Sequence, residues 1–507
     1  MNDEKIGGTP YFLIYVIYQK IMKVVELIQR SSIRMLFTSL EFLLFFFPVT
    51  LGIYFFLPHR ARNYWLLLAS LFFYAWGEPT FVLAMMFSIV FNYFAALRIE
   101  ELYAKRSAQK GFLALTVFIN LGILFVFKYM NFVTKNMREI FPVVQDTIPQ
   151  TSFVLPIGIS FFTFQAMSYV IDVYRGTPAQ KNLGYLGLYI SLFPQLIAGP
   201  IVRYTTVMDQ MERREITWDT FSGGMLRFLY GFNKKILLAN ILAEVADAAF
   251  RMEELSIAMA WLGAVCYALQ IYFDFSGYSE MAIGMGRMFG FRFLENFNHP
   301  YMSKTMTDFW RRWHISLGSW FRDYLYFPLG GSRVKSKWRL VFNLAVVWLA
   351  TGAWHGASWN FIFWGMLHGT VIVIEKLFSL PQRLQKKNGI AALYQVFTLL
   401  VVLFGWVFFR AEGFLTGVTY VKAMLGLGGN LLTDSAFRFY LREYGMILAA
   451  GILCSTSLLQ WCRKKIPHQR AEALWDQGAE VIQLLLFLVG VSCLVMNAHN
   501  PFIYFNF

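Results

Sequence analysis

The sequence predicts an all-α, multi-pass membrane protein. Of its 507 residues, 57% are hydrophobic and 19% are aromatic, whereas only 15% are charged. The mean hydropathy of +0.49 is well above that of an ordinary soluble protein. Apolar segments recur from one end of the chain to the other, and a helix that spans a bilayer needs roughly 20 such residues. These observations place the chain in a membrane and exclude a soluble globular domain.

Thirteen apolar segments are candidates for membrane helices. In chain order they are residues 36–57, 64–76, 81–97, 112–127, 153–173, 184–198, 228–249, 257–275, 338–353, 359–378, 393–409, 446–461 and 481–496. Several are too short to cross a bilayer unaided, so we expect roughly 9 to 13 spans. Helix ends inside a membrane are tolerated only where protein or water surrounds them. The short segments therefore predict an internal cavity, where chemistry would take place.

The amino-terminal residues 1–34 precede the sustained apolar pattern, which begins at Met35. Residues 11–28 mix aromatic with charged side chains, as an amphipathic helix on the membrane surface would. We favour the alternative that translation starts at Met35 and that the extension is an artefact, because nothing in it resembles a cleavable signal peptide. No long polar stretch or internal repeat divides the remainder, so residues 35–507 are predicted to form one membrane domain.

The formal net charge of +15 raises the question of a nucleic-acid partner. The basic residues are scattered through short loops instead of lying on one element, so we expect no such partner. Retention of Lys and Arg in cytoplasmic loops explains the excess, and it places the basic clusters 98–110, 333–339, 376–387 and 463–470 inside the cell. The four cysteines show neither metal-type nor redox-type spacing, so we expect no metal site and no disulfide framework.

Residues 296–329 differ in kind from the apolar segments, because charged and polar side chains alternate there with tryptophan and phenylalanine. This segment cannot cross lipid alone. We expect it to form a helix that is buried among other helices, with its polar side facing water or substrate.

The seven histidines are the candidate bases of a catalytic site. Four of them lie beside basic residues or at turns and are set aside: His59, His299, His468 and His499. An ionisable residue within a membrane segment is by default a functional candidate. For His368, however, we favour a structural role, in which a neutral imidazole ties helices together through a hydrogen bond. His314 and His355 remain.

His355 lies at a turn between segments 338–353 and 359–378, and Gly352 and Gly356 flank it. The other ends of both segments lead to basic loops, so this turn is predicted to face the non-cytoplasmic side. An imidazole is suited to take a proton from an alcohol near neutral pH, as acyl transfer to a hydroxyl requires. The chain has no Gly-x-Ser-x-Gly elbow, and the glycines of 284–290 follow a membrane segment with no strand before them, so they indicate close helix packing.

Five ordered motifs carry a resemblance to a known family. They are residues 156–162, 193–203, 272–279, 309–316 and 351–359. On these motifs the chain is identified as a member of the membrane-bound O-acyltransferases (MBOAT), in their bacterial alginate O-acetylase-like branch, from Met35 to Phe507.

The resemblance implies a ring of helices around a thin central catalytic tunnel, with a funnel on the outer face and a narrow passage to the cytoplasm. His355 matches the near-invariant histidine of the family, and His314 matches its second active-site position. Gln195, Arg203 and Asp274 are motif residues that we expect to line the tunnel.

For function, the resemblance implies transfer of an acyl group, in the first place acetyl, to hydroxyls of an exported polysaccharide such as alginate, at a bacterial inner membrane. The donor would be acetyl-CoA or an acyl carrier protein from the cytoplasm, with no tightly bound cofactor, and a periplasmic SGNH-type acetyltransferase or esterase would be a partner. D-alanyl transfer to teichoic acid is the alternative reaction. A glycan or lipid transporter is the non-enzymatic alternative, but it predicts inverted repeats that are not seen.

The chain ends in Phe-Ile-Tyr-Phe-Asn-Phe. This ending resembles that of alginate O-acetylase-like members and of a small accessory protein in the D-alanylation system, which implies an acyl relay at Tyr504. An aromatic anchor at the membrane interface is the alternative.

Overall fold

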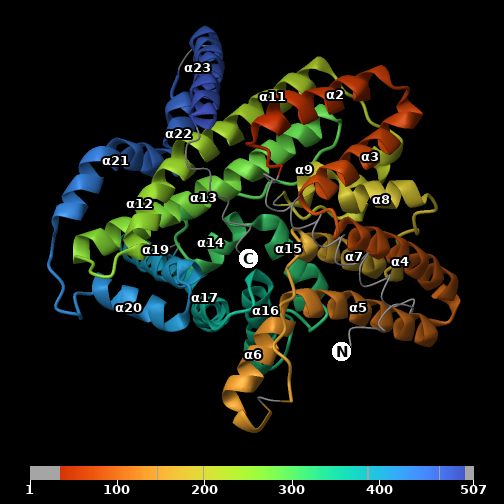
Figure 1. The fold of residues 1–507 in the computed structure, drawn as a ribbon, viewed down its shortest axis with the longest axis horizontal. Helices are drawn as coiled ribbons and strands as arrows, with labels where there is room; N and C mark the ends of the chain where they lie inside the picture. The colour runs from red at the N-terminus through yellow and green to blue at the C-terminus, as the bar shows by residue number, and fades with distance from the viewer. Residues whose placement is uncertain (1–34, 145–146, 198, 385–387, 467–468, 497–507) are drawn as a thin grey trace, which may run out of the picture.

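The computed structural model describes residues 35–496, apart from 145–146, 198, 385–387 and 467–468 (Figure 1). The predicted extension 1–34 and the predicted relay residue Tyr504 lie outside the described residues. Within the described part, every regular element is a helix and there is no strand, so the predicted all-α fold is confirmed.

The α-helices are α2 (Phe47–Phe56), α3 (His59–Gly77), α4 (Val82–Glu101), α5 (Arg106–Lys128), α6 (Met130–Ile140), α7 (Ile159–Tyr174), α8 (Leu183–Ser191), α9 (Phe193–Leu196), α10 (Tyr204–Glu212), α11 (Trp218–Asn233), α12 (Asn240–Arg251), α13 (Ile257–Met288), α14 (Met306–Arg312), α15 (Ile315–Phe321), α16 (Lys337–His355), α17 (Trp359–Leu377), α18 (Leu380–Leu384), α19 (Asn388–Arg410), α20 (Phe414–Met424), α21 (Ser435–Cys454), α22 (Leu458–Lys464) and α23 (Gln469–Val495). Three further elements are π-helical, namely η1 (Phe42–Phe46), η4 (Lys234–Ala239) and η6 (Arg322–Tyr326), and three are short 3₁₀ turns, namely η2 (Leu102–Ala104), η3 (Pro142–Val144) and η5 (Pro300–Met302).

Five helices in the described part are long and apolar enough to cross a membrane: α4 with η2, α5, α13, α19 and α23. A sixth is added if α21 and α22, which meet at a bend of 59°, form one broken span. The protein is therefore a multi-pass membrane protein. The number is smaller than the 9 to 13 spans expected from apolar segments, because other segments form short or broken helices, such as α8 and α9.

Helix α13 is the centre of the fold. It has 32 residues, and 78% of its most apolar stretch is buried. Its glycines allow α11 to approach backbone to backbone: a Cβ added at Gly277 would lie 2.6 Å from the carbonyl oxygen of Gly231, and one at Gly284 would lie 2.5 Å from that of Gly224. The glycines of this region thus serve close helix packing, as the sequence indicates.

The prediction of one continuous helix within residues 296–329 is wrong. Two short helices, α14 and α15, are separated by Trp313 in an extended conformation and by His314 at φ 45° and ψ 53°, in the left-handed region. The preceding residues stabilise this break, because Asn298 N–H donates to the Arg312 carbonyl and Ile315 N–H donates to the Asn296 carbonyl. These two hydrogen bonds replace helical hydrogen bonds that are missing at the break.

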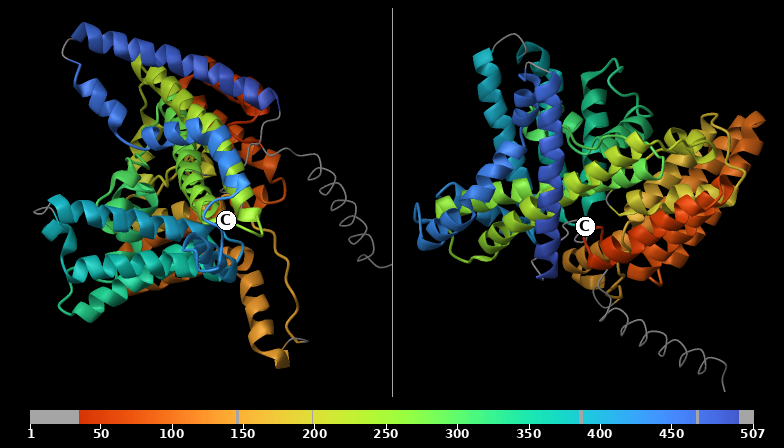
Figure 2. Two further views of the ribbon diagram at one scale, coloured as in Figure 1. Left: turned by 90° about the vertical axis from the view of Figure 1, so that its left-hand side faces the viewer. Right: turned by 90° about the horizontal axis from the view of Figure 1, so that it is seen from above.

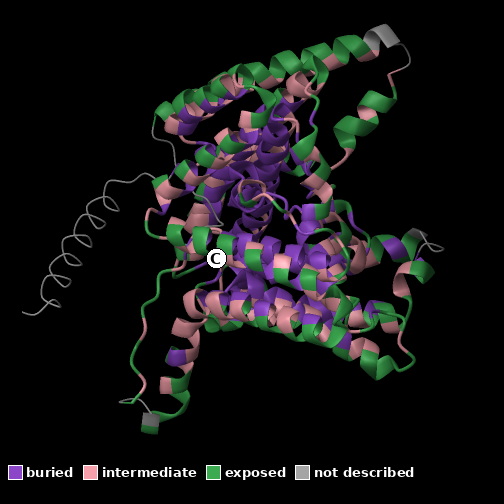
Figure 3. Ribbon diagram, turned by 90° about the vertical axis from the view of Figure 1, so that its right-hand side faces the viewer, coloured by how far each residue is buried: buried purple, intermediate pink, exposed green. Residues whose placement is uncertain are grey.

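Two helices stand away from the main body. Helix α6 projects from the end of α5 (Figures 1 and 2), and α23 runs along one edge with most of its surface exposed (Figure 3). Only 6% of the most apolar stretch of α23 is buried. It is attached through the Phe487 ring, 4.8 Å from that of Phe232, and through the Asn233 amide, which donates to the Gln483 carbonyl.

Candidate active site

The turn that carries His355 depends on close packing of α16 against α17. A Cβ added at Gly352 would lie 2.5 Å from the carbonyl oxygen of Phe361, and one at Gly365 would lie 2.5 Å from that of Trp348. His355 is the last residue of α16, and Gly356 follows in an extended conformation. The two helices therefore meet at a tight, glycine-lined junction, with His355 at its tip.

The His355 side chain is 5% exposed and is enclosed by aromatic rings. Ring centroids lie 5.0 Å away for Trp354, 4.9 Å for Trp364 and 5.2 Å for Phe409. Its Nε2 atom has no hydrogen-bond partner in the described part of the chain. A buried polar atom without a partner is costly and calls for an explanation. A reacting group that receives its partner from the substrate is one such explanation.

The His314 ring is held in one orientation by Asn296. The Ser316 N–H donates to Asn296 Oδ1 over 3.2 Å, which fixes that atom as the amide oxygen. His314 Nδ1 lies 3.1 Å from the same oxygen and must therefore carry the proton. The lone pair of a neutral His314 is then on Nε2. Ser279 completes the arrangement, because its Oγ accepts a hydrogen bond from the Asn296 amide.

One indole links the two predicted active-site histidines. The Trp354 ring centroid lies 6.0 Å from that of His314 and 5.0 Å from that of His355. The two imidazoles are close enough to interact electrostatically. The structure thus brings together two residues that are 41 positions apart in the sequence, although their catalytic roles stay predictions.

Glu375 on α17, a residue that the sequence reasoning missed, holds the start of α14. Its carboxylate is fully buried and accepts hydrogen bonds from the N–H groups of Met306 and Thr307 over 2.7 and 2.8 Å. The Thr307 hydroxyl and the Tyr394 hydroxyl donate to it as well. A carboxylate at the amino end of a helix satisfies its unpaired N–H groups and complements its dipole. Through α14, Glu375 fixes the segment that leads to His314.

His368 lies one helical turn beyond Trp364 and is fully buried. Rings surround it, with centroids 5.0 Å away for Trp364 and 5.5 Å for Trp310. The hydrogen bond expected from His368 to another helix is not seen, because neither of its ring nitrogens has a partner in the described part of the chain. The structural role of His368 stays a prediction.

Of the three predicted tunnel residues, Gln195 and Asp274 are buried. Gln195 donates to the Tyr189 carbonyl over 2.5 Å, and its Oε1 atom has no hydrogen-bond partner in the described part of the chain. Asp274 on α13 forms an ion pair of 2.6 Å with Lys235, and both side chains are almost fully buried. Its neighbour Phe275 is the residue that contacts the His314 ring, with centroids 4.6 Å apart.

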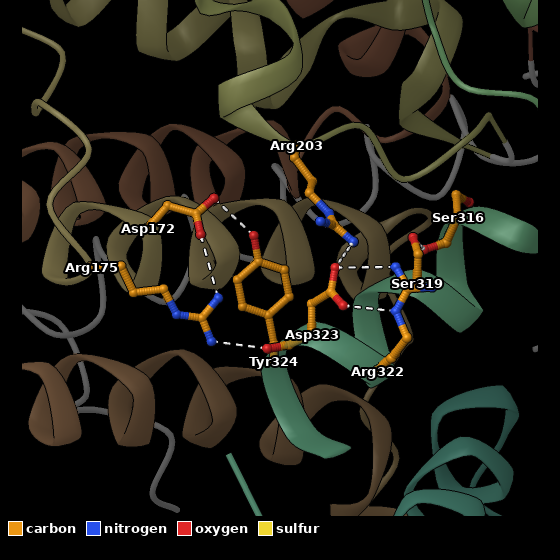
Figure 4. A network of polar contacts seen from close by, with 8 residues as sticks. All are labelled: Asp172, Arg175, Arg203, Ser316, Ser319, Arg322, Asp323 and Tyr324. Atoms are coloured by element: carbon orange, nitrogen blue, oxygen red, sulfur yellow. Dashed lines mark hydrogen bonds and ion pairs between the residues drawn. The ribbon is translucent and has the colours of Figure 1, made fainter. Parts of the chain in front are cut away.

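The third residue, Arg203, lines a polar pocket of about 460 Å³ (Figure 4). The lining residues are Asp172, Arg175, Arg203, Thr205, Asp323, Tyr324 and Phe327.

Ion pairs and hydrogen bonds connect the walls of this pocket. Arg203 pairs with Asp323 over 2.6 Å, and the Tyr324 hydroxyl donates to Asp172 over 2.8 Å. Burial alone would raise the pKa of Asp323, but the hydrogen bonds and positive charges of Arg322 and Arg203 hold it below its usual range.

The polar pocket is connected to the histidine pair through α15. This seven-residue helix begins directly after His314 and ends directly before Arg322. At its first turn, the Ser316 hydroxyl accepts a hydrogen bond from the Ile201 N–H over 3.0 Å and donates to Asn296. Ser316 therefore contacts both the loop that carries Arg203 and Asn296, the residue that orients His314.

Comparisons with known proteins show what the chain is similar to. The model of the family described as "MBOAT, membrane-bound O-acyltransferase family" matches residues 181–418, which include both histidines. Proteins named "probable alginate O-acetylase AlgI" are similar over 93% of this chain and 100% of their own length, with 45% identity for that of Pseudomonas aeruginosa and 40% for that of Azotobacter vinelandii. A peptidoglycan O-acetyltransferase of Helicobacter pylori is 33% identical over 93% of this chain and 98% of its own length.

Proposed function

Because the chain belongs to the membrane-bound O-acyltransferase family, we propose that it moves acetyl groups from a cytoplasmic thioester to hydroxyls of an exported polysaccharide. The protein is an O-acyltransferase, and the proposal concerns its donor, its acceptor and the direction of transfer. One observation supports the transfer reaction. The His355 imidazole is buried, and its Nε2 atom lacks a hydrogen-bond partner in the described residues. A second histidine, His314, lies nearby with its Nδ1 atom directed at Asn296.

In the proposed reaction, His355 Nε2 takes the proton of the attacking hydroxyl. The hydroxyl oxygen forms a bond to the thioester carbonyl carbon, and the C–S bond of the resulting tetrahedral intermediate breaks. The departing sulfur receives the proton back from the His355 imidazolium. His314 assists across the Trp354 ring, where the lone pair on its Nε2 atom can accept a hydrogen bond from the substrate or from a water molecule.

For the donor, we propose acetyl-CoA or an acetylated carrier protein that docks at the polar pocket. Arg175 and Arg203 line the pocket opposite Asp172 and Asp323, and Arg322, which lies outside the lining, also pairs with Asp323. Together these three arginines outnumber the two carboxylates, which suits an anionic donor. Asp323 and Tyr324 of the pocket wall belong to η6. Along the chain η6 is followed by the basic residues 333–339, which the positive-inside rule assigns to the cytoplasm. The donor would thus approach from the α15 side and the acceptor from the opposite side.

For the acceptor, we propose alginate or a similar uronate polysaccharide, because the relatives with 40 to 45% identity are named for alginate. Peptidoglycan is the runner-up, on the 33% identical relative. The proposed location is a bacterial inner membrane, with a periplasmic SGNH-type protein as partner and with no tightly bound cofactor. An acetyl relay through Tyr504 remains part of the proposal, and a tyrosine ester trapped by mass spectrometry would support it.

D-alanyl transfer to teichoic acid is less favoured, because the relatives that match over the whole chain carry O-acetylation names. A transporter is set aside, since the family is one of acyltransferases. Cell-surface glycan from a strain that lacks the protein should have lost its O-acetyl groups, and a change in D-alanyl ester instead would overturn the choice of acyl group.

The test of the central residue compares two buried histidines on adjoining helices. His355→Gln should lower the O-acetyl content of the polysaccharide by a factor of about 10² to 10⁴, the usual contribution of a general base. His368→Gln, the matched control, should keep most of the activity. Both variants must reach the membrane in folded form, which gel filtration in detergent monitors. Wild-type acetylation by folded His355→Gln would refute the mechanism.

A further inference from the structure

Two side chains at the end of α5 contact the last turn of α16, the helix that ends at His355. Lys128 is the final residue of α5, and Tyr129 follows it. The Tyr129 hydroxyl donates to the Ala353 carbonyl over 2.8 Å. The Lys128 ammonium donates to the Trp354 carbonyl and, over 3.3 Å, to the Ser160 hydroxyl. Residues 128 and 129 thus contact the two residues immediately before His355.

These contacts satisfy groups that a helix cannot satisfy itself. The last four carbonyls of an α-helix have no partner within the helix. The backbone N–H of Gly356, the residue after α16, makes no capping hydrogen bond to them. In a membrane, water does not replace such partners, and each buried carbonyl without one is costly. Lys128 and Tyr129 supply the missing donors for two consecutive carbonyls. They act as a side-chain cap that comes from a different helix.

The charge of Lys128 suits this position. The carboxyl end of a helix carries partial negative charge, which a cation stabilises. Lys128 is 8% exposed, and no carboxylate forms a salt bridge with it among the residues that the structure describes. A lysine buried in a membrane protein without an acidic partner is expensive and is by default a candidate for function.

A purely structural link between α5 and α16 could be made anywhere along their length. Here it is made at Ala353 and Trp354, so a displacement at these carbonyls moves the His355 ring directly. The Trp354 ring also has neighbours in this region. The Phe161 ring of α7 lies 5.4 Å from it, and the Lys128 ammonium lies 5.7 Å from its centre. The Trp354 indole, which lies near both histidines, is therefore held by residues of the same region.

We propose that Lys128 and Tyr129 are positioning residues of the acyltransferase, which cap the carboxyl end of α16 and so hold the His355 imidazole in its reactive orientation. The inference rests on the proposed function, because it assigns His355 as the base. It adds two residues from a distant segment to the catalytic machinery, and it gives a reason for a buried lysine in an apolar helix.

The test uses Tyr129→Phe, which removes one hydroxyl and leaves the ring. Tyr420→Phe is the matched control. Tyr420 is buried, whereas Tyr129 is partly buried, but the hydroxyl of Tyr420 likewise donates to a backbone carbonyl, that of Ala260, over 3.0 Å. Membranes that contain the full-length protein are assayed with radiolabelled acetyl-CoA and alginate oligosaccharides as probes. Tyr129→Phe should lower kcat about tenfold and leave KM unchanged, because misplacement of a reacting group affects the chemical step. Tyr420→Phe should change neither constant.

Lys128→Met should lower kcat about a hundredfold, and Lys128→Arg, which keeps the charge and the donors, should recover part of that loss. An unchanged kcat for Tyr129→Phe, or an equal loss in Tyr420→Phe, would overturn the inference while the proposed function stands. Folded His355→Gln that is fully active would refute the proposed function, and the inference would be lost with it.

Discussion

The junction of α16 and α17 makes a quantitative prediction for Gly352→Ala. The new Cβ would lie 2.5 Å from the carbonyl oxygen of Phe361 and 3.3 Å from the Cα of Ile362. Ordinary contacts of this kind begin near 3.4 Å, and both neighbours are backbone atoms that cannot rotate away. The helices would therefore have to separate by roughly 1 Å, as overpacked interfaces do.

This separation has two costs. Overpacking destabilises by about 1 to 3 kcal/mol, which exceeds the gain of roughly 0.5 to 1 kcal/mol that Ala brings to a helix relative to Gly. His355 follows Gly352 by one helical turn, so the imidazole moves with the helix. A displacement near 1 Å can lower a reaction rate by about 10²-fold. We therefore expect a protein of reduced stability and far lower activity.

Thermal unfolding of the detergent-solubilised protein and the O-acetyl content of the polysaccharide measure the two effects. Gly478→Ala in α23 is the matched control, because nothing lies within 4 Å of its added Cβ, and it should be neutral or slightly stabilising. The reasoning fails if Gly352→Ala unfolds at the wild-type temperature with wild-type acetylation, or if Gly478→Ala is equally harmful.

Three further predictions concern the surroundings of the site. Glu375→Gln should destabilise the protein by about 1 to 3 kcal/mol, because an amide nitrogen would face N–H donors that the carboxylate now satisfies; an unchanged unfolding temperature would contradict this. Asn296→Leu should lower kcat about tenfold or more through loss of the fixed His314 tautomer, whereas a change confined to KM would argue against the assignment. Because the folded-state pKa of Asp323 is lowered, its ion pairs stabilise the protein above pH of about 4 and are lost as the pH falls further. Asp323→Asn should therefore flatten the acid side of a plot of unfolding temperature against pH, and an unaltered plot would exclude this contribution.

The sequence predicts the helical segments well because apolar composition alone determines which parts of the chain enter a membrane. Segments 112–127 and 393–409 lie within single helices, and segment 81–97 does so apart from its first residue. The break at His314 could not be predicted in the same way. Hydrogen bonds from Ile315 N–H to the Asn296 carbonyl and from Asn298 N–H to the Arg312 carbonyl stabilise this break, and those contacts exist only once the chain has folded.

The candidate site was predicted in part. The sequence singles out His314 and His355, and both rings lie near that of Trp354, but their catalytic roles stay predictions. Lys128 and Glu375 were missed, although each is a charged residue in or beside an apolar segment, which is the signal that could have revealed them. Their partners lie 226 and 69 positions away, and no local pattern encodes such pairings.

Because α23 is weakly attached to the rest of the protein, we expect that the chain can be divided in front of this helix. A helix with 6% of its apolar stretch buried gains little from the body of the protein, and its own mean hydropathy of 2.2 is enough to hold it in a bilayer. Such a helix behaves as a separate insertion unit, so a chain cut between α22 and α23 should assemble from two co-expressed fragments. In genetic terms, we expect α23 to function when it is encoded by a separate reading frame.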